Sequence, residues 1–289
     1  MSYVQLSLLM QNFESPLIDP KDLPLGSCIV IDARSGPDAY QRFASNHLVG
    51  ALHVDVDRDL SQKPYDPAYG GRHPLPDLEE FTRFLGNLGI TPSSHVIVYD
   101  DKHGANAAAR FWWMLRALGH NKVQVVNGGL DAIIQHRLPM SSDIQNPTGA
   151  PPYPANVWRR PTVGIHDVMN ALKDGSRTVI DVREGYRFRG ESEPIDLIAG
   201  HIPGAINVPY LDNLSEDGTF RSAEELASQF KNLLGKRNAS DIIVHCGSGV
   251  TACHTLLAME HAGLKGASLY VGSWSEWSRR DLPVGTGNE

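Results

Sequence analysis

The sequence predicts an α/β protein of two tandem domains, each a mainly parallel sheet flanked by helices. Three observations predict this fold class. Short runs rich in valine and isoleucine recur without strict polar alternation, as in strands buried on both faces of a parallel sheet. Segments with helical periodicity separate these runs. The same succession of features then repeats at an offset of roughly 145 to 155 residues, which indicates a duplicated α/β domain.

The first copy contains four strand-like runs, two helical patterns and a closing Leu-Pro pair. In chain order, the runs are residues 28–34, 46–55, 95–100 and 125–129, the helical patterns are 77–88 and 105–118, and the pair is Leu138-Pro139. The order of strand, helix and strand is that of an α/β layer structure.

The second copy has matching features in the same order. Its runs are residues 178–183, 200–209, 242–246 and 270–273, its helical patterns are 222–233 and 251–262, and it closes with Leu282-Pro283. Ser222 and Glu225 have the spacing of a capping box at a helix start. Residues 141–160 are rich in proline and polar side chains and form the predicted linker. The expected domains are therefore 1–140 and 161–289.

Composition excludes several classes of function. The 289 residues are 41% hydrophobic, which is ordinary for a globular chain, and 26 Lys and Arg against 33 Asp and Glu give a net charge of −7. This balance does not suit a nucleic-acid or anionic-membrane partner. The N-terminus lacks a basic leader, and no segment approaches the roughly 18 apolar residues of a membrane span. We therefore expect a cytoplasmic protein.

Cys246 is the strongest candidate for a reactive residue. It ends the third strand-like run of the second copy, where the first copy has Asp100. Gly247 and Gly249 follow, and a helical pattern begins near Thr251. Such a turn can direct several N–H groups at one point and favour a thiolate, with a pKa of roughly 3.5 to 7.5 instead of about 8.5. The alternative is a small buried residue, which remains the interpretation for Cys253 and Cys28.

Two other chemistries of this segment are disfavoured. A zinc site would use His245, Cys246, Cys253 and His254, but neither a Cys-x-x-Cys nor a His-x3-His spacing is present. Cysteine-dependent phosphate-ester hydrolysis needs an arginine separated from the cysteine by five residues, and that position is Ala252. The sequence therefore predicts no metal and no phosphate clamp.

Six short motifs in a fixed order connect the chain with a known family. They are Asn46-His-Leu-Val-Gly-Ala51, Arg110-Phe-Trp-Trp-Met114, Gly128-Gly129, Gly200-His-Ile-Pro-Gly-Ala205, Cys246-Gly-Ser-Gly-Val-Thr251 and Gly272-Ser-Trp-Ser-Glu-Trp277. With them, essentially the whole chain resembles the two-domain rhodanese superfamily of sulfurtransferases, most closely the 3-mercaptopyruvate sulfurtransferases. The resemblance implies two rhodanese-like domains, of which the first is catalytically silent.

The loop after Cys246 separates subfamilies within this resemblance. Enzymes specialised for thiosulfate commonly carry an Arg-Lys pair after the cysteine, whereas here Gly247, Ser248 and Gly249 carry no charge. An uncharged loop looks like the mercaptopyruvate version, whose donor has one carboxylate and a neutral ketone. The resemblance then implies that Cys246 attacks the donor sulfur, that pyruvate leaves, and that the Cys246 persulfide passes its sulfur to an acceptor.

The resemblance also assigns roles to other residues. Ser248 matches the serine of a proposed relay, whose histidine and aspartate map to His73 and Asp57 in the first domain. The loop that holds the thiolate and the persulfide through its N–H groups includes Gly247, Gly249, Val250 and Thr251.

Arg187 matches the arginine that binds the donor carboxylate, a role suited to a planar fork of donors. The family's second arginine, in a Glu-Pro-Arg run, is missing here, because the segment reads Glu193-Pro-Ile-Asp196. Arg189 is the candidate to replace it. Asn106 stands where the family often carries a bulky aromatic residue. These departures predict weaker or less selective donor binding.

The sequence therefore predicts a sulfurtransferase that needs no metal and no organic cofactor. Its expected partners are a small-molecule sulfur donor and a thiol acceptor such as thioredoxin or glutathione, or cyanide, with no nucleic acid and no membrane. Two alternatives stay open at this point. The donor could be thiosulfate, or the chain could be a non-catalytic rhodanese-like module that binds a partner or senses oxidants through its thiol.

Overall fold

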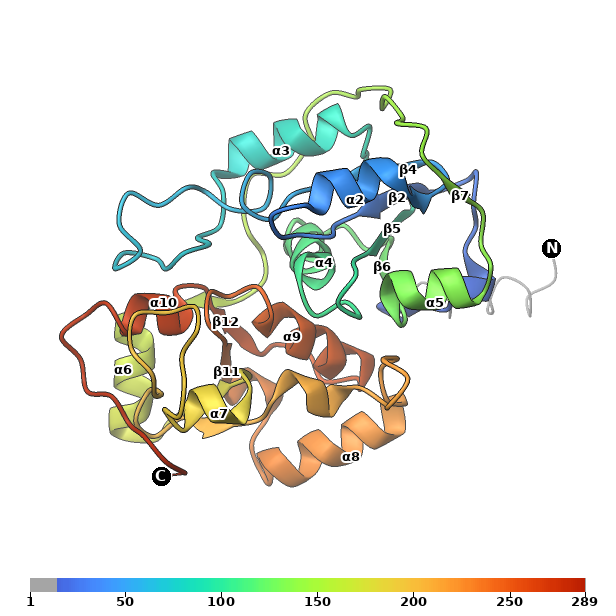
Figure 1. Ribbon diagram of the computed structural model, residues 1–289. Helices are drawn as coiled ribbons and strands as arrows, with labels where there is room; N and C mark the ends of the chain where they lie inside the picture. Colours follow the sequence, from blue (N-terminus) through green and yellow to red (C-terminus); the bar gives the residue numbers. More distant parts are fainter. Residues whose placement is uncertain (1–14, 289) are drawn as a thin grey trace. The chain divides into compact units, whose positions relative to one another are not determined.

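The computed structural model describes residues 15–288, so the N-terminal segment inspected above for a leader lies largely outside the described part. The chain divides into two compact units (Figure 1). The first comprises the described residues up to Val56 together with Asp77–Arg159, and the second comprises Asp57–Pro76 together with the chain from Arg160 onward. The segment Asp57–Pro76, called the arm below, thus lies in the second unit although its sequence position is inside the first repeat.

The first unit is built on a five-stranded sheet in which every neighbouring pair of strands is parallel. Its order across the sheet is β1 (Leu17–Ile18), β6 (Val123–Val126), β5 (Val96–Tyr99), β2 (Ile29–Asp32) and β4 (Ala51–His53). All four residues of the central strand β5 are buried. Burial on both faces explains why these strands are continuous valine and isoleucine runs.

Helices cover this sheet. They are η1 (Pro20–Asp22), α2 (Ala39–Ser45), α3 (Leu78–Asn87), α4 (Ala107–Ala117) and α5 (Gly129–Gln135). Phe43 of α2 and Ile133 of α5 share a hydrophobic cluster with Val30 and Ile97 of the sheet. The helix predicted at 77–88 begins one residue later, because the Asp77 side chain caps it by accepting the N–H groups of the second and third helical residues.

The second unit repeats the sheet. Its strands, again all parallel, are in the order β10 (Ile206–Asn207), β9 (Thr178–Asp181), β11 (Ile242–His245), β12 (Ser268–Tyr270) and β8 (Thr162–Val163). This is the order of the first sheet read from the other edge. An antiparallel pair, β3 (His47–Leu48) with β7 (Met140–Ser141), also has a counterpart in the bridge between His201 and Gly285. The predicted duplication is therefore present strand by strand.

The second unit has seven helices among the described residues, of which α8 and α9 correspond to the two predicted helical patterns. They are α6 (Ile165–Asp174), α7 (Gly185–Phe188), η2 (Tyr210–Asn213), α8 (Ala223–Leu234), η3 (Ala239–Asp241), α9 (Ala252–His261) and α10 (Ser273–Trp277). Val168 of α6, Ile243 of β11 and Trp274 of α10 belong to one hydrophobic cluster. The predicted capping box is formed, since Ser222 and Glu225 exchange both hydrogen bonds.

The predicted linker packs against the first unit over much of its length. Ala150 donates its N–H to Gly86 at 2.8 Å, and Tyr153 donates its N–H to Thr82 at 2.9 Å. Gly86 allows this approach, because a Cβ there would lie 2.6 Å from the carbonyl oxygen of Pro151. The proline-rich composition therefore marks an irregular strap over α3, and the two units part at Arg159 and Arg160.

The topology of the second sheet marks one place for a site. The chain leaves β9 toward the edge strand β10, whereas it leaves β11 in the opposite direction, toward β12. In open parallel sheets, ligands bind outside the carboxyl ends of the two strands at which the direction reverses. Those strands are β9 and β11, so the loops that follow Asp181 and His245 are expected to form the site.

A buried ion pair fixes the strand end that precedes this reversal in each unit. Arg34 pairs with Asp32 at 2.6 Å, and Arg183 pairs with Asp181 at 2.5 Å. Each arginine also donates to a backbone carbonyl further along its own unit, at 3.0 Å and 2.7 Å respectively. The repeated pair holds the loop after β2 and the loop after β9 close to their sheets.

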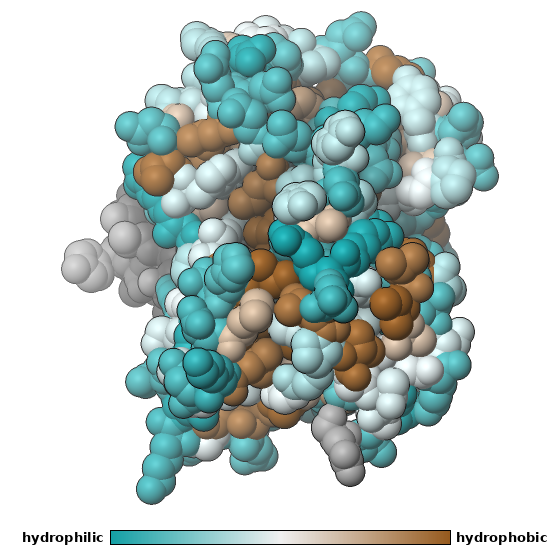
Figure 2. All heavy atoms as spheres, turned by 90° about the vertical axis from the view of Figure 1, so that its left-hand side faces the viewer, coloured by the Kyte–Doolittle hydropathy of each residue, from teal (hydrophilic) through white to brown (hydrophobic). Residues whose placement is uncertain are grey.

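The surface mixes polar and apolar side chains. On the face that Figure 2 presents, hydrophobic side chains lie in patches among polar ones. One exposed apolar stretch, Ile195, Leu197 and Ile198, is 58%, 65% and 43% exposed. No helix among residues 15–288 is long and apolar enough to cross a membrane.

Candidate active site

Cys246 lies where the topology places a site, directly after β11. Its side chain is buried, with 3% of its surface exposed. The following residues turn sharply before α9 starts at Ala252. Gly249 takes a positive φ of +75°, as the sequence suggested, and its missing Cβ would lie 2.6 Å from the Val271 carbonyl oxygen. The φ of Gly247 is not positive, so its backbone conformation does not require glycine.

The residues after β12 form hydrogen bonds with the backbone of the cysteine loop. Ser273 Oγ accepts the N–H of Cys246 at 3.3 Å, while Trp274 donates its N–H to the Cys246 carbonyl at 3.0 Å. Ser275 similarly donates its N–H to the carbonyl of Gly247 at 2.8 Å. Ser273 adopts a φ of +54°, which is uncommon for a residue other than glycine. This clamp was not inferred from the sequence, where the Gly-Ser-Trp-Ser-Glu-Trp motif served only as a family signature.

The equivalent loop of the first unit shows where its backbone N–H groups point. They converge on the carboxylate of Asp100, which stands in the place of Cys246. The four hydrogen bonds come from Lys102 at 2.9 Å, Gly104 at 2.8 Å, Asn106 at 3.2 Å and Ala108 at 3.1 Å. A loop whose N–H groups converge in this way can bind an anion and is called the cradle below. In the first unit, the anion is the carboxylate of Asp100.

In the second unit, the cradle contains no carboxylate of its own, because Cys246 stands in the place of Asp100. The positions equivalent to Lys102 and Gly104 are Ser248 and Val250. Within residues 15–288, no acceptor lies within hydrogen-bond distance of the N–H groups of Ser248 and Val250. Among the described residues, two N–H groups of the loop that follows Cys246 are thus without an acceptor.

The structure joins Ser248, His73 and Asp57 in one hydrogen-bonded chain. His73 Nδ1 lies 2.7 Å from Ser248 Oγ, and His73 Nε2 lies 2.9 Å from Asp57 Oδ1. The Asp57 carboxylate is 75% exposed, whereas the His73 ring is 19% exposed. Two hydrogen bonds with one ring fix its orientation. These are the three residues that the resemblance selected, and all of them belong to the second unit.

The arm that carries His73 is docked by side chains around α10. Glu276 accepts the N–H of Gly70 at 3.1 Å, Ser275 Oγ accepts the N–H of Arg72 at 3.0 Å, and Arg280 donates to the Ala68 carbonyl at 2.6 Å. These bonds use the arm's backbone, so they fix the path of the chain whatever its side chains are. The motif that clamps the cysteine loop therefore also positions the histidine.

Arg187, the predicted carboxylate-binding arginine, is held by acidic side chains. Glu193 accepts from its Nη2 at 2.7 Å and from its Nε at 3.1 Å, and Glu184 lies 3.5 Å from its Nη1. Burial alone would lower the pKa of Arg187, but hydrogen bonds and the charge of Glu193 outweigh it and raise the pKa. Most donors of this guanidinium are therefore already used.

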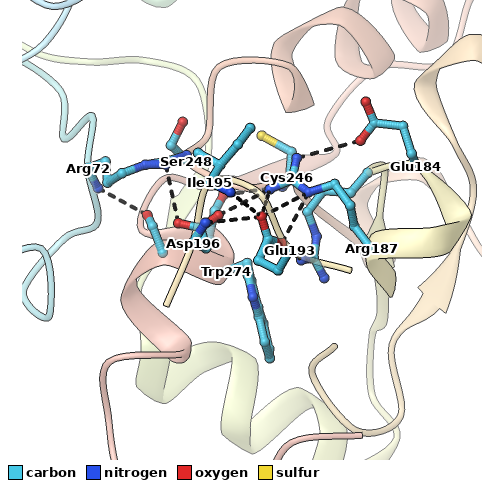
Figure 3. Close-up of polar contacts among 12 residues, drawn as sticks. Arg72, Glu184, Arg187, Glu193, Ile195, Asp196, Cys246, Ser248 and Trp274 are labelled. Carbon is cyan, nitrogen blue, oxygen red and sulfur yellow. Dashed lines mark hydrogen bonds and ion pairs between the residues drawn. The ribbon is translucent and has the colours of Figure 1, made fainter. Parts of the chain in front are cut away.

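Asp196 lies between two arginines, as Figure 3 shows. Its carboxylate is 3.3 Å from Arg72 Nη1 and 3.3 Å from Arg187 Nη2, and its side chain has no exposed surface. Arg279 approaches the same carboxylate at 3.6 Å. Burial raises the pKa of Asp196, and the arginines oppose that shift. Neither Asp196 nor Arg72 received a role from the sequence, although Asp196 ends the Glu193-Pro-Ile-Asp196 segment and Arg72 directly precedes His73.

The structure does not bring Arg189 to the loop. Its guanidinium pairs with Glu191 at 2.5 Å on the surface, where the Arg189 side chain is 37% exposed. Ile195, at the place of the family's second arginine, is exposed. Asn106 donates to Ser35 Oγ at 2.5 Å within the first unit. Neither Arg189 nor Ile195 thus supplies a second cation beside Cys246.

The other two cysteines have the surroundings expected of structural residues. Cys253 is fully buried in α9, where its Sγ donates to the Gly249 carbonyl at 3.4 Å. Burial raises the pKa of Cys28 to about 11. His254 stacks on Phe220, with ring centroids 4.4 Å apart. No group of three His, Cys, Asp or Glu side chains suited to a metal ion occurs among the described residues.

Comparisons with known proteins identify the family of the chain. The model of the Rhodanese-like domain family matches residues 11–136 and again residues 165–280. A probable 3-mercaptopyruvate sulfurtransferase of Pseudomonas aeruginosa is 39% identical over 297 residues and 100% of both chains. The human 3-mercaptopyruvate sulfurtransferase is 38% identical over 86% of this chain and 82% of its own. The thiosulfate sulfurtransferase of Gallus gallus is 35% identical over 88% of this chain and 87% of its own.

Solved structures of related enzymes resemble the chain as well. The 3-mercaptopyruvate sulfurtransferase from Leishmania major matches with a TM-score of 0.81 and 31% identity, over 92% of this chain and 74% of that one. The likeness extends over both units, as the two matches of the domain family also do.

Proposed function

The chain belongs to the rhodanese-like family, and from that membership we propose that it is a sulfurtransferase that moves sulfur from 3-mercaptopyruvate through a persulfide on Cys246. The observation that carries the proposal is the open cradle. The loop that collects four N–H groups on Asp100 in the first unit surrounds a cysteine in the second. Donors directed at one point stabilise a thiolate before attack and a persulfide anion after it.

The first half-reaction follows from this arrangement. The Cys246 thiolate attacks the donor sulfur, an S–S bond forms, and the C–S bond of the donor breaks. The bonding electrons pass to carbon, where the neighbouring ketone delocalises them as an enolate, and a proton then gives pyruvate. Ser248 and His73 are hydrogen-bonded beside the loop, so they are the groups we assign to proton movement at the donor, with Asp57 orienting the ring.

The second half-reaction returns the enzyme to its starting state. A thiolate of thioredoxin or glutathione, or cyanide, attacks the outer sulfur of the persulfide. The S–S bond breaks and its electrons return to Cys246 as a thiolate. The loop donors stabilise the leaving thiolate as they stabilise the attacking one, so the same loop serves both steps.

Mercaptopyruvate is the favoured donor because the loop carries no charge of its own. Gly247, Ser248 and Gly249 offer only backbone donors and one hydroxyl to the donor. Thiosulfate, a dianion, suits a loop with basic side chains. Thiosulfate sulfurtransferases are nonetheless among the relatives, so thiosulfate is the donor that an experiment has to compare.

The experiment treats reduced enzyme with each donor and measures added sulfur on Cys246 by peptide mass spectrometry, together with kcat/KM. We expect one added sulfur and a higher kcat/KM with mercaptopyruvate. Cys246→Ser should abolish both, and Cys28→Ser, in the first unit, should keep both. A preference for thiosulfate would refute the donor assignment alone. No added sulfur with either donor would favour a non-catalytic module.

A further inference from the structure

Asp196 is a buried carboxylate beside the nucleophile that the proposed mechanism does not use. Its side chain has no exposed surface, and it lies between Arg72 and Arg187, 3.3 Å from each (Figure 3). A Cβ on Gly247 would lie 3.2 Å from Asp196 Oδ2, closer than the 3.3 Å and 3.4 Å to the two guanidinium groups. The residue that follows Cys246 therefore has a negative charge as its nearest charged neighbour.

The Asp196 carboxylate is held less completely than Glu193, another acid of the same segment. Glu193 accepts hydrogen bonds from Arg187 at 2.7 Å, from Arg183 at 3.1 Å and from two backbone N–H groups at 3.0 Å. Asp196 Oδ2 accepts a hydrogen bond from Arg187 at 3.3 Å, and Asp196 Oδ1 is buried with no hydrogen-bond partner among the described residues. The desolvation of a buried charge is repaid only when hydrogen bonds satisfy its lone pairs. Of these two acids, Asp196 is therefore the one that another carboxylate can replace.

The pKa shifts of the two acids have opposite directions. Burial by itself would raise the pKa of Glu193, but hydrogen bonds from Arg187 and from backbone N–H groups lower that pKa below its ordinary value. Burial raises the pKa of Asp196, and the neighbouring arginines oppose that shift without reversing it. The ionised form of Asp196 is thus compensated less well than that of Glu193, in agreement with the hydrogen bonds of the two acids.

Both arginines have contacts that do not involve Asp196. The guanidinium of Arg187 donates to Glu193 at 2.7 Å and 3.1 Å. The backbone of Arg72 is fixed because its N–H group donates to Ser275 Oγ at 3.0 Å. Removal of the Asp196 carboxylate would therefore free two positive charges beside the loop and leave these contacts in place.

The apolar neighbours of Asp196 contribute little to holding it in place. Ile195, Leu197 and Ile198 are 58%, 65% and 43% exposed, so their side chains bury little apolar surface. The Ile198 carbonyl accepts the indole N–H of Trp274 at 2.9 Å, which fixes the end of the segment. The carboxylate can thus leave its place while the end of the segment stays attached.

We propose that Asp196 is a specificity-determining residue, an internal carboxylate that occupies the space between the arginines beside Gly247 and is displaced when the carboxylate of a sulfur donor enters. This inference rests on the proposed function and adds to it a residue that weakens the binding of carboxylate donors. Asp196 belongs to the segment Glu193-Pro-Ile-Asp196, which departs from the family's Glu-Pro-Arg run. A donor that has to displace an internal group binds with an affinity reduced by the fraction of molecules in which the space is free.

The test compares 3-mercaptopyruvate with mercaptoacetone, which has the same thiol and ketone but a methyl group in place of the carboxylate. Asp196→Asn should raise kcat/KM for mercaptopyruvate by about 3- to 10-fold, because the competing carboxylate is gone, and change it less than about 2-fold for mercaptoacetone. Asp196→Ala should act in the same direction. Glu191→Gln removes the same charge from a nearby side chain that is 55% exposed, and it should match the wild type with both donors.

Binding of pyruvate separates this inference from the proposed function. Calorimetric titration should show that pyruvate binds folded Asp196→Asn more tightly than the wild type, by a similar factor, whether or not sulfur is transferred. Unchanged or weaker pyruvate binding would overturn the inference and show that Asp196 only holds the arginines in place. Equal gains with both donors would also overturn it, since mercaptoacetone has no carboxylate. Wild-type enzyme that gains no sulfur would refute the proposed function, and the pyruvate titration alone would then decide on Asp196.

Discussion

The loops after β5 and β11 have the same place in two equivalent sheets but different contents. After β5, the carboxylate of Asp100 accepts four backbone N–H groups of its own loop. After β11, Cys246 stands in that place, and the N–H groups of Ser248 and Val250 have no acceptor within the described chain. The same position of the scaffold thus holds a carboxylate that accepts the N–H groups of its loop in one unit, and a cysteine that leaves two such groups without an acceptor among the described residues in the other.

The residues just before the two loops differ in a related way. Tyr99 precedes Asp100, and its hydroxyl accepts the N–H of Leu48 at 3.0 Å. His245 precedes Cys246, and its Nε2 lies 3.9 Å from Asp181. The first unit therefore places a tyrosine directly before its loop. The second unit places a histidine there.

The largest expected effect comes from giving the second loop the residue of the first. Cys246→Asp should lower sulfur transfer by at least about 10⁴-fold, because a carboxylate cannot form the persulfide. It should also be more thermally stable than Cys246→Ala, since the carboxylate can accept the free N–H groups. Activity assays and melting temperatures check both parts. A Cys246→Asp variant less stable than Cys246→Ala would break the comparison.

Removal of the Asp100 carboxylate tests the first loop. Asp100→Ala should destabilise the first unit by about 2–4 kcal/mol, because it leaves buried N–H groups without an acceptor. Amide hydrogen exchange in β5 would report the loss, and Asp143→Ala, an exposed position in the same unit, is the matched control. Transfer by folded Asp100→Ala should equal that of the wild type. Unchanged exchange in β5 would show that the four hydrogen bonds contribute little.

The smallest expected effect is a pH dependence of the stability of the second unit. Burial lowers the pKa of His245 below its ordinary 6.5, although the charge of Asp181 opposes this. Below pH 6.5, His245 binds a proton in the unfolded chain that it does not bind in the folded unit. The free energy of unfolding of the second unit therefore has its full value above pH 6.5 and decreases as the pH falls below it. The contribution at pH 5 is less than about 2 kcal/mol.

His245→Gln should remove this component from hydrogen exchange in β11 between pH 7 and pH 5. The first unit has a buried histidine of its own, His120, whose pKa burial lowers to about 4, and exchange there should be the same in both proteins. An unchanged pH dependence in β11 would assign it to another group.

Much of the fold could be predicted from the sequence because its signals are local or repeated. Continuous apolar runs indicated buried parallel strands, and the spacing of Ser222 and Glu225 indicated a helix start. The duplication by itself aligns Cys246 with Asp100. The resemblance selected Ser248, His73 and Asp57, which the structure joins by hydrogen bonds.

The rest of the site depends on contacts between distant segments. Arg72 precedes His73 in a Gly-Gly-Arg-His run, yet only the docking of the arm on α10 shows that it faces Gly247. Asp196 is buried while its neighbours Ile195 and Leu197 are exposed, the reverse of the usual preference of acidic and apolar residues. No local pattern predicts such an inversion, because arginines from other segments cause it.

The arm also bears on why a duplicated gene keeps both copies. The second unit contains the cysteine, yet the chain between Asp57 and Pro76, encoded within the first repeat, supplies His73, Asp57 and Arg72 to it. A second repeat without the first would therefore lack His73. The repeat without the Cys246 equivalent thus supplies twenty residues that fold with the other repeat.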